Sequence, residues 1–123
     1  MKIDDWQESD ILPESLTKMP KIDGSNVLPL EGEIDLHVSP RIASSLAAIV
    51  KAKPKTLVVD LSKVTYIDSS GLAVLIEGMQ NVEAYGGKFA LAGLQEGLRP
   101  IFEIARLDQV FRLFPDVEAA LAA

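Results

Sequence analysis

The feature that most constrains the fold is a β-branched apolar run at residues 56–61, Thr-Leu-Val-Val-Asp-Leu. A near-continuous run of this kind is typical of a central strand that is buried on both faces of its sheet. Segments with strand and helix patterns alternate along the rest of the chain, and the connections between them have lengths that suit crossovers. We therefore predict an α/β fold in which helices cover at least one face of a sheet.

Before this run, the pattern indicates a β-hairpin. Residues 18–22 and 27–30 have strand character, and residues 23–26, Asp-Gly-Ser-Asn, are good turn formers. Pro29 lies inside the second strand. Because proline lacks the backbone N–H that a ladder needs, this strand is predicted to lie at a sheet edge or to end nearby.

Helix signals complete the domain. Ser39 is predicted to cap the first helix and Pro40 to occupy its first position, where the missing N–H is not needed. Residues 51–55 hold three lysines around a proline and are predicted to end this helix. The other predicted elements are a helix at 70–85 stopped by Gly86 and Gly87, a strand at 88–94, and helices at 99–106 and 116–122.

The chain of 123 residues suits one domain at residues 17–123, preceded by an acidic tail at residues 1–16. Trp6 is the unusual residue of the tail. It is predicted to pack loosely on the domain or to stay mobile. The alternative is that the tail docks a partner or a second copy of the chain.

Composition excludes several classes of protein. Without cysteine, the chain has no disulfide, thiolate metal ligand or cysteine nucleophile, and this composition fits a cytoplasmic location. The net charge of −6 disfavours nucleic acids and anionic membrane surfaces as partners. The sequence has no signal-peptide core and no apolar stretch long enough for a membrane span. We expect no direct nucleic-acid binding and no membrane insertion.

An enzymatic function is not predicted. His37 is the only histidine, so a catalytic base beside a nucleophile and a zinc site both lack their usual residues. We expect His37 to lie at the surface, between a strand and a helix. The usual glycine-rich phosphate loops are also absent. No catalytic residue, metal or cofactor is therefore predicted.

The most informative segment is the turn Asp-Ser-Ser-Gly-Leu at residues 68–72. One interpretation is ordinary capping of the helix that follows. The other is phosphorylation, because a helix N-terminus tolerates an anion and the added charge would block a docked partner. Gly71 is costly in a first helical turn, and its missing side chain is predicted to let another protein's backbone approach.

A second segment, Leu-Glu-Gly-Glu-Ile-Asp at residues 30–35, is weak alone and fits a strand end with a glycine bulge. Together, however, the two segments resemble the hallmarks of the STAS family, the domain of bacterial anti-sigma factor antagonists. Residues 56–62 are similar to that family's central strand, and residues 86–91, 100–107 and 116–121 to its later elements. The resemblance implies a single domain with a four- to five-stranded mixed sheet and helices packed mainly on one face.

The resemblance also implies a mechanism of partner switching. It places the phosphorylated hydroxyl at Ser70, with Ser69 as the second choice. The partners it implies are an anti-sigma factor serine kinase with a histidine-kinase-like ATPase fold, bound only by the unphosphorylated chain, and a metal-dependent serine phosphatase. A weak homodimer is left open. The residues expected to contact the partner are Asp35, Asp68, Ser69, Ser70, Gly71 and Leu72.

The alternative function is that of a STAS subunit in a transporter, such as a lipid-trafficking ABC complex, where the domain is a structural interaction module. The turn of those members often departs from Asp-Ser-Ser-Gly-Leu. A neighbouring gene for a kinase-like ATPase or a serine phosphatase would favour switching, and a neighbouring permease would favour the transporter.

Overall fold

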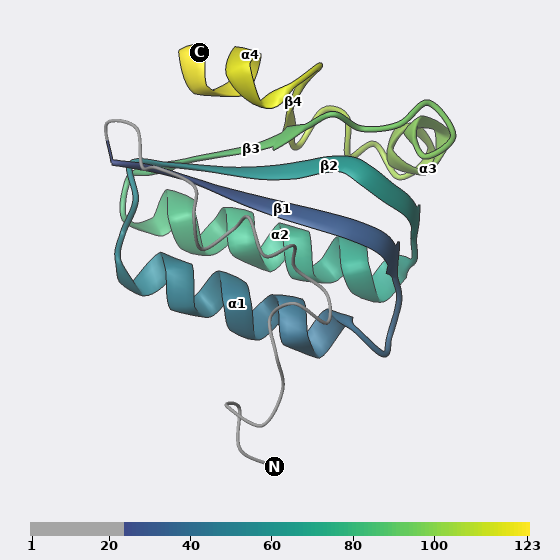
Figure 1. The fold of residues 1–123 in the computed structure, drawn as a ribbon, viewed down its shortest axis with the longest axis horizontal. Helices are drawn as coiled ribbons and strands as arrows, with labels where there is room; N and C mark the ends of the chain where they lie inside the picture. Colours follow the sequence, from purple (N-terminus) through teal and green to yellow (C-terminus); the bar gives the residue numbers. More distant parts are fainter. Residues whose placement is uncertain (1–23) are drawn as a thin grey trace.

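The computed structural model describes residues 24–123 (Figure 1). Four strands form one sheet in the order β1-β2-β3-β4, and each neighbouring pair is parallel. The strands are β1 (Ser25–Ile34), β2 (Thr56–Ile67), β3 (Lys88–Ala92) and β4 (Arg112–Phe114), and the helices are α1 (Ser39–Lys51), α2 (Ser69–Ala84), α3 (Arg99–Ile104) and α4 (Val117–Ala122). The α/β prediction is confirmed.

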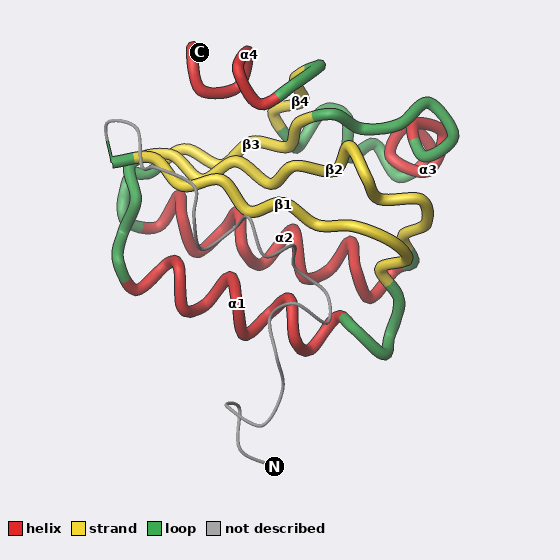
Figure 2. The backbone as a smooth tube through the Cα atoms, viewed as in Figure 1, coloured by secondary structure: helices red, strands yellow, loops and turns green. Residues whose placement is uncertain are grey.

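The helices are distributed unevenly over the sheet. Helices α1 and α2 lie side by side below the sheet in Figure 1, whereas the short α4 lies above it and α3 lies above the right-hand end of β2. The same arrangement is visible by element type in Figure 2, with both long helices on one side of the strands. This agrees with the predicted packing of helices mainly on one face.

Strand β2 is central, as predicted from its apolar run. Its side chains alternate between a large core, which includes Leu57 and Val59, and a smaller cluster on the other face, which includes Val58 and Ala120 of α4. All three of these β2 side chains are fully buried. The strand extends to Ile67, beyond the predicted end at residue 61, so that it leads directly to the turn at Asp68.

Strand β1 differs in detail from the predicted hairpin. Ser25 and Asn26 belong to the strand and pair with Thr56 and Leu57, so the prediction that they form the turn is wrong. Pro29 precedes a register shift, and within residues 24–123 β1 pairs with β2 alone. This position fits a proline, since among the described residues no second strand pairs with β1 and needs the missing N–H.

Some predictions fall on residues outside the described range. These are the strand at residues 18–22, which would make the sheet mixed, the acidic tail at residues 1–16, and the docking role of Trp6. Within residues 24–123 the sheet is parallel throughout.

The helix boundaries are close to those predicted, with one correction at α1. Val38 occupies the N-cap position without a side-chain cap, and Ser39 is already helical. Ser39 is therefore not the cap, and its buried side chain has a different contact, described below. Gly86 has a φ of +86° and follows α2, which confirms the predicted left-handed stop.

Two elements near the C-terminus were harder to predict. Helix α3 ends at Ile104, before the predicted residue 106, and Arg106 has a positive φ of 59°. Strand β4 was missed. It has only three residues, which are too few to show an alternating pattern, and it exists because Leu113 pairs with Leu91 of β3.

Candidate functional site

The turn between β2 and α2 is organised by the carboxylate of Asp68. This residue is the N-cap of α2, and its Oδ1 accepts hydrogen bonds from the backbone N–H groups of Ser70 at 2.9 Å and Gly71 at 3.1 Å. The same oxygen accepts the hydroxyl of Ser70 at 2.5 Å. Local sequence explains the arrangement, because an aspartate before a helix satisfies N–H groups that have no partner inside it.

A second chain segment closes this site from the side of α1. The hydroxyl of Ser39, which is buried, lies 2.8 Å from the hydroxyl of Ser70. Ser39 Oγ also donates to the backbone carbonyl of Asp35 at 2.7 Å. The backbone N–H of Asp68 donates to the carbonyl of Ile34 at 3.1 Å, which ties the end of β1 to the start of α2. Ser70 is therefore half-buried between two loops.

The three oxygen contacts share only two hydroxyl protons, those of Ser39 and Ser70. The bond to a carboxylate is the strongest of them, because its acceptor carries a charge. The proton of Ser70 therefore lies on the bond to Asp68, and the proton of Ser39 serves either Asp35 or Ser70. A hydroxyl oxygen has two lone pairs, and Ser39 can donate to only one of them. In both arrangements the oxygen of Ser70 therefore keeps a lone pair that accepts no hydrogen bond from Ser39.

Gly71 has a role in the fold that was not predicted. The residue is buried, and a Cβ built on it would lie 2.8 Å from both Ile34 Cγ2 and Ile67 Cγ1 and 3.1 Å from the Ile34 carbonyl. The missing side chain lets α2 approach the ends of β1 and β2. This packing explains the glycine within the fold, and the approach of a partner's backbone at Gly71 stays a prediction.

The remaining predicted site residues lie at different depths. Ser69 is exposed, whereas Leu72 is half-buried and packs partly on the core. Asp35 is half-buried, and its carboxylate accepts a hydrogen bond from the backbone N–H of His37 at 2.9 Å. Its link to Ser70 is indirect, because its backbone carbonyl contacts Ser39 Oγ, which in turn contacts the Ser70 hydroxyl. His37 is exposed in the loop between β1 and α1, as predicted.

Two residues of the site were not singled out in the sequence. Ser39 was interpreted only as a cap, since its contact with Ser70 spans 31 positions of the chain. Leu36 is 72% exposed beside the site, and its backbone N–H interacts with the carboxylate of Asp68. The sequence feature that could have pointed to Leu36 is its position as an apolar residue between two polar ones, Asp35 and His37, in a predicted loop.

The electrostatics of the site predict a measurable titration effect. The hydroxyl of Ser70 is the largest cause that lowers the pKa of Asp68 below the ordinary value of 3.8. Burial opposes it as the next largest effect, and the N–H groups of Gly71, Ser70 and Leu36 each lower the pKa further. A lowered pKa in the folded state stabilises the fold above the ordinary value, and this contribution is lost as the pH falls through the lowered pKa.

We therefore expect Ser70→Ala to raise the pKa of Asp68 towards its ordinary value. Carbon-detected NMR titration of the Asp68 carboxyl group would measure it. The variant should lose stability relative to the wild type at pH 7. The difference should shrink as the pH falls from about 3.8 through the lowered pKa of Asp68, since Asp68 is protonated in both proteins only below that lowered pKa. Ser69→Ala is the control, since Ser69 forms no bond to Asp68. An unchanged pKa in Ser70→Ala would contradict the assigned bond.

Two other features, a metal cluster and a membrane-spanning helix, are absent from the part of the chain that the structure describes. Residues 24–123 hold no group of three or more metal-ligating His, Cys, Asp or Glu side chains. Within the same residues, each helix is too short or too polar to cross a membrane.

Three known proteins are similar to this chain over most of its length, one compared by sequence and two by structure. The anti-sigma-F factor antagonist RsfB of Mycobacterium tuberculosis is 31% identical over 110 residues, which cover 89% of each chain. An anti-sigma factor antagonist from Mycobacterium paratuberculosis has a crystal structure that superposes with a TM-score of 0.76 at 30% identity, covering 84% of this chain and 87% of that one. A sulfate transporter family protein from Wolinella succinogenes shares the fold at 23% identity, with a TM-score of 0.74 and coverage of 89% and 92%.

Each of these likenesses covers most of the chain. The model of the STAS domain matches residues 17–120, so the chain belongs to the STAS domain family.

Proposed function

We propose that this chain is an anti-sigma factor antagonist of the cytoplasm, whose binding to an anti-sigma kinase is controlled by reversible phosphorylation of Ser70. The observation that carries the proposal is the bond of 2.5 Å between the Ser70 hydroxyl and the Asp68 carboxylate at the start of α2. The relatives named as anti-sigma factor antagonists, which cover most of the chain, support it. The chain then acts by binding, and the kinase is the enzyme.

The site suits phosphoryl transfer to Ser70. Its hydroxyl proton points to Asp68, so a lone pair of Oγ is free for the γ-phosphorus of ATP held by the kinase. The bond between Oγ and this phosphorus forms, the bond from the phosphorus to the bridging oxygen breaks, and ADP leaves. The proton passes to Oδ1 of Asp68 and then to water. Asp68 is a weak base, because its pKa is lowered, and we infer that it mainly orients the hydroxyl.

Phosphorylation would change the charge and the hydrogen bonds of the site as well as its size. Ser70 would lose its proton donor and gain about −1.5 to −2 charges beside the carboxylate of Asp68. The phosphate would also compete with Asp68 for the N–H groups of Ser70 and Gly71, which have no acceptor inside the helix. The start of α2 then carries two adjacent anions, and a partner built to cover a neutral hydroxyl would meet both.

The surface around Ser70 supports a protein as the partner. Leu36 is 72% exposed, and its backbone interacts with Asp68, so an apolar side chain stands directly beside the phosphorylation site. Tyr66, near the end of β2, is 46% exposed. An apolar anchor beside a polar switch is typical of an interface in which the anchor supplies affinity and the charge decides whether the complex forms.

The experiment that tests this function is reconstitution with the kinase partner. The full chain would be incubated with the purified anti-sigma kinase and Mg-ATP, the modified residue mapped by mass spectrometry, and the affinity of both forms measured by calorimetry. We expect phosphate on Ser70, no modification of Ser70→Ala, and a loss of kinase binding in the phosphorylated form. Ser69→Ala is the matched control and should be modified normally.

Three results would count against the proposal. Phosphate on Ser69 alone would move the switch to the exposed neighbour. Equal affinity of the two forms would remove the switch. Co-purification with a permease and its ATPase, in place of a kinase, would favour the transporter subunit.

A further inference from the structure

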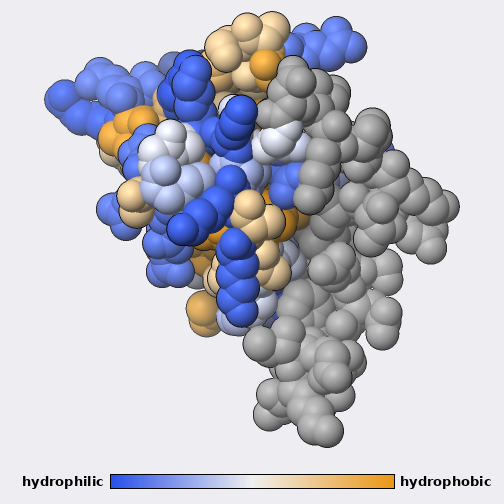
Figure 3. All heavy atoms as spheres, turned by 90° about the vertical axis from the view of Figure 1, so that its left-hand side faces the viewer, coloured by the Kyte–Doolittle hydropathy of each residue, from blue (hydrophilic) through white to orange (hydrophobic). Residues whose placement is uncertain are grey.

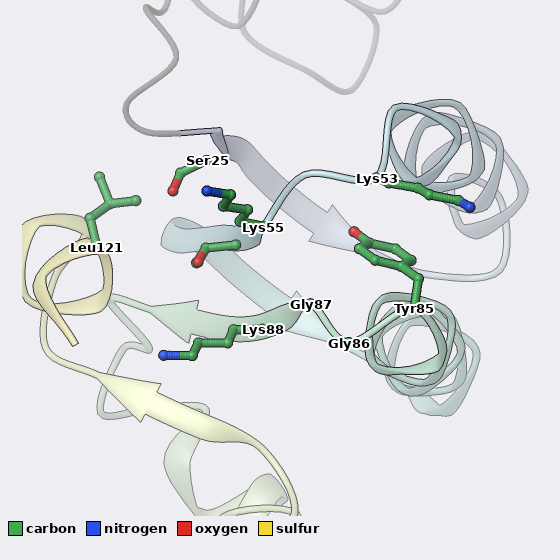
Figure 4. A pocket seen from close by; sticks show the side chains of 9 residues that line it. Ser25, Lys53, Lys55, Tyr85, Gly86, Gly87, Lys88 and Leu121 are labelled. Atoms are coloured by element: carbon green, nitrogen blue, oxygen red, sulfur yellow. The ribbon is translucent and has the colours of Figure 1, made fainter.

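A pocket of about 580 Å³ lies at the end of the molecule that is remote from Ser70. It opens at the amino ends of the strands, whereas Ser70 follows the carboxyl end of β2, whose 12 residues span roughly 40 Å. Figure 4 shows the pocket, and Figure 3 faces this end of the molecule, with hydrophilic side chains gathered across it. The lining residues are Ser25, Lys53, Lys55, Thr56, Tyr85, Gly86, Gly87, Lys88 and Leu121.

The charge of this pocket is opposite to that of the whole chain. Three lysines, Lys53, Lys55 and Lys88, line it without any acidic side chain, although the chain carries a net charge of −6. Within residues 24–123 none of the three forms an ion pair. Like charges around one cavity repel one another, and an anion placed among them relieves this repulsion.

Backbone hydrogen bonds fix the main chain from which the lysine side chains, all exposed, project. The N–H of Lys55 donates to the Gly24 carbonyl at 2.9 Å, and the N–H of Lys88 donates to the Lys55 carbonyl at 2.8 Å. The hydroxyl of Tyr85 donates to the Pro54 carbonyl at 2.7 Å, which fixes the loop between α1 and β2 against the end of α2. The pocket is thus assembled from the starts of three strands.

Side chains supply the hydrogen-bond donors, because the backbone N–H groups of Gly86, Gly87 and Lys88 are already used. In Figure 4, Lys55 and Lys88 extend towards the side of the pocket bounded by Ser25 and Leu121, and Lys53 lies on the other side with Tyr85. The ammonium groups of Lys55 and Lys88 and the hydroxyl of Ser25 thus lie on the same side of the pocket as the apolar Leu121. Such donors match the several oxygens of a doubly charged phosphate.

We propose that this pocket binds a small phosphate monoester, with the phosphate between Lys55 and Lys88 and the apolar part of the ligand against Leu121. The ligand would bind about one sheet length away from Ser70, so the proposal stands independently of the proposed function. It assigns a role to two lysines, Lys55 and Lys88, that the phosphorylation switch does not use.

The test uses the full chain and three probes: phenyl phosphate, inorganic phosphate and benzoate. Amide shifts of Ser25, Thr56 and Lys88 would be followed by two-dimensional NMR up to about 10 mM of each probe, the range in which weak binding is measurable. We expect saturable shifts, with phenyl phosphate binding tightest. Inorganic phosphate lacks the apolar part, and benzoate has a single charge.

Two variants with equal charge change give the decisive comparison. Lys55→Gln with Lys88→Gln should weaken phenyl phosphate binding by about tenfold or more, because both charged donors are lost. Lys63→Gln with Arg106→Gln, at exposed positions outside the pocket, should change it by less than about twofold, since salt screens distant charges. Unshifted pocket amides, equal weakening in both double variants, or inorganic phosphate binding as tightly as phenyl phosphate would each overturn the proposal.

Discussion

Ser70→Glu is expected to lower the affinity for the anti-sigma kinase by about 100-fold, while Ser70→Ala should bind at least as tightly as the wild type in the presence of ATP. A like-charge contact at an interface costs several kcal/mol, and each 1.4 kcal/mol is a factor of ten in affinity. Glutamate puts this charge beside the carboxylate of Asp68, whose Oδ1 lies 2.5 Å from the Ser70 hydroxyl. Alanine adds no charge and cannot be phosphorylated, so it should stay in the binding form. Isothermal calorimetry would measure both affinities.

Gln80→Glu provides a matched control for the added charge. Gln80 is exposed on the same helix, and ten residues of α-helix separate it from Ser70 by about 15 Å. This distance exceeds the Debye length at physiological salt, so the control should bind almost as well as the wild type. If Gln80→Glu weakened binding as much as Ser70→Glu, the effect would come from total charge, and position 70 would not be the switch.

The second large effect is expected at Gly71. Replacing it with alanine should destabilise the fold by about 1–3 kcal/mol, the usual cost of adding a methyl group to a closely packed core. The new Cβ would come within 2.8 Å of Ile34 and Ile67 side chains and 3.1 Å of a backbone carbonyl, and the backbone cannot move without displacing the end of β1. The better helix propensity of alanine offsets at most about 1 kcal/mol. Urea denaturation would report the loss as a lower midpoint.

Gly97→Ala is the control for this experiment. Gly97 is exposed, and a Cβ built on it meets no atom within 4 Å, so its replacement should leave the midpoint nearly unchanged. A Gly71→Ala variant as stable as the wild type would show that α2 can move away from the strands. The glycine would then need another explanation, and the prediction that it meets a partner's backbone would gain support.

Much of the candidate site follows from short-range sequence. An aspartate before a helix accepts N–H groups that are two and three positions away, so the bonds from Asp68 to Ser70 and Gly71 need no distant residue. The β-branched run at residues 56–61 and the left-handed stop at Gly86 are equally local, since they depend on side-chain branching and on the lack of a Cβ. These features were predicted correctly in type, with boundaries that shifted by one to several residues.

The tertiary structure decided what surrounds that site. Ser39 reaches Ser70 across 31 positions only because β1 and β2 pair in parallel and bring both following loops to one end of the sheet. The same packing leaves no room for a side chain at position 71, which explains the glycine there. It also brings Lys55 and Lys88 to one pocket at the opposite end of the sheet. The sequence by itself determined the turn that presents a hydroxyl at a helix start. Contacts between distant segments depend on strand register and helix packing, which no local pattern encodes, so the neighbours of that hydroxyl became known only from the folded chain.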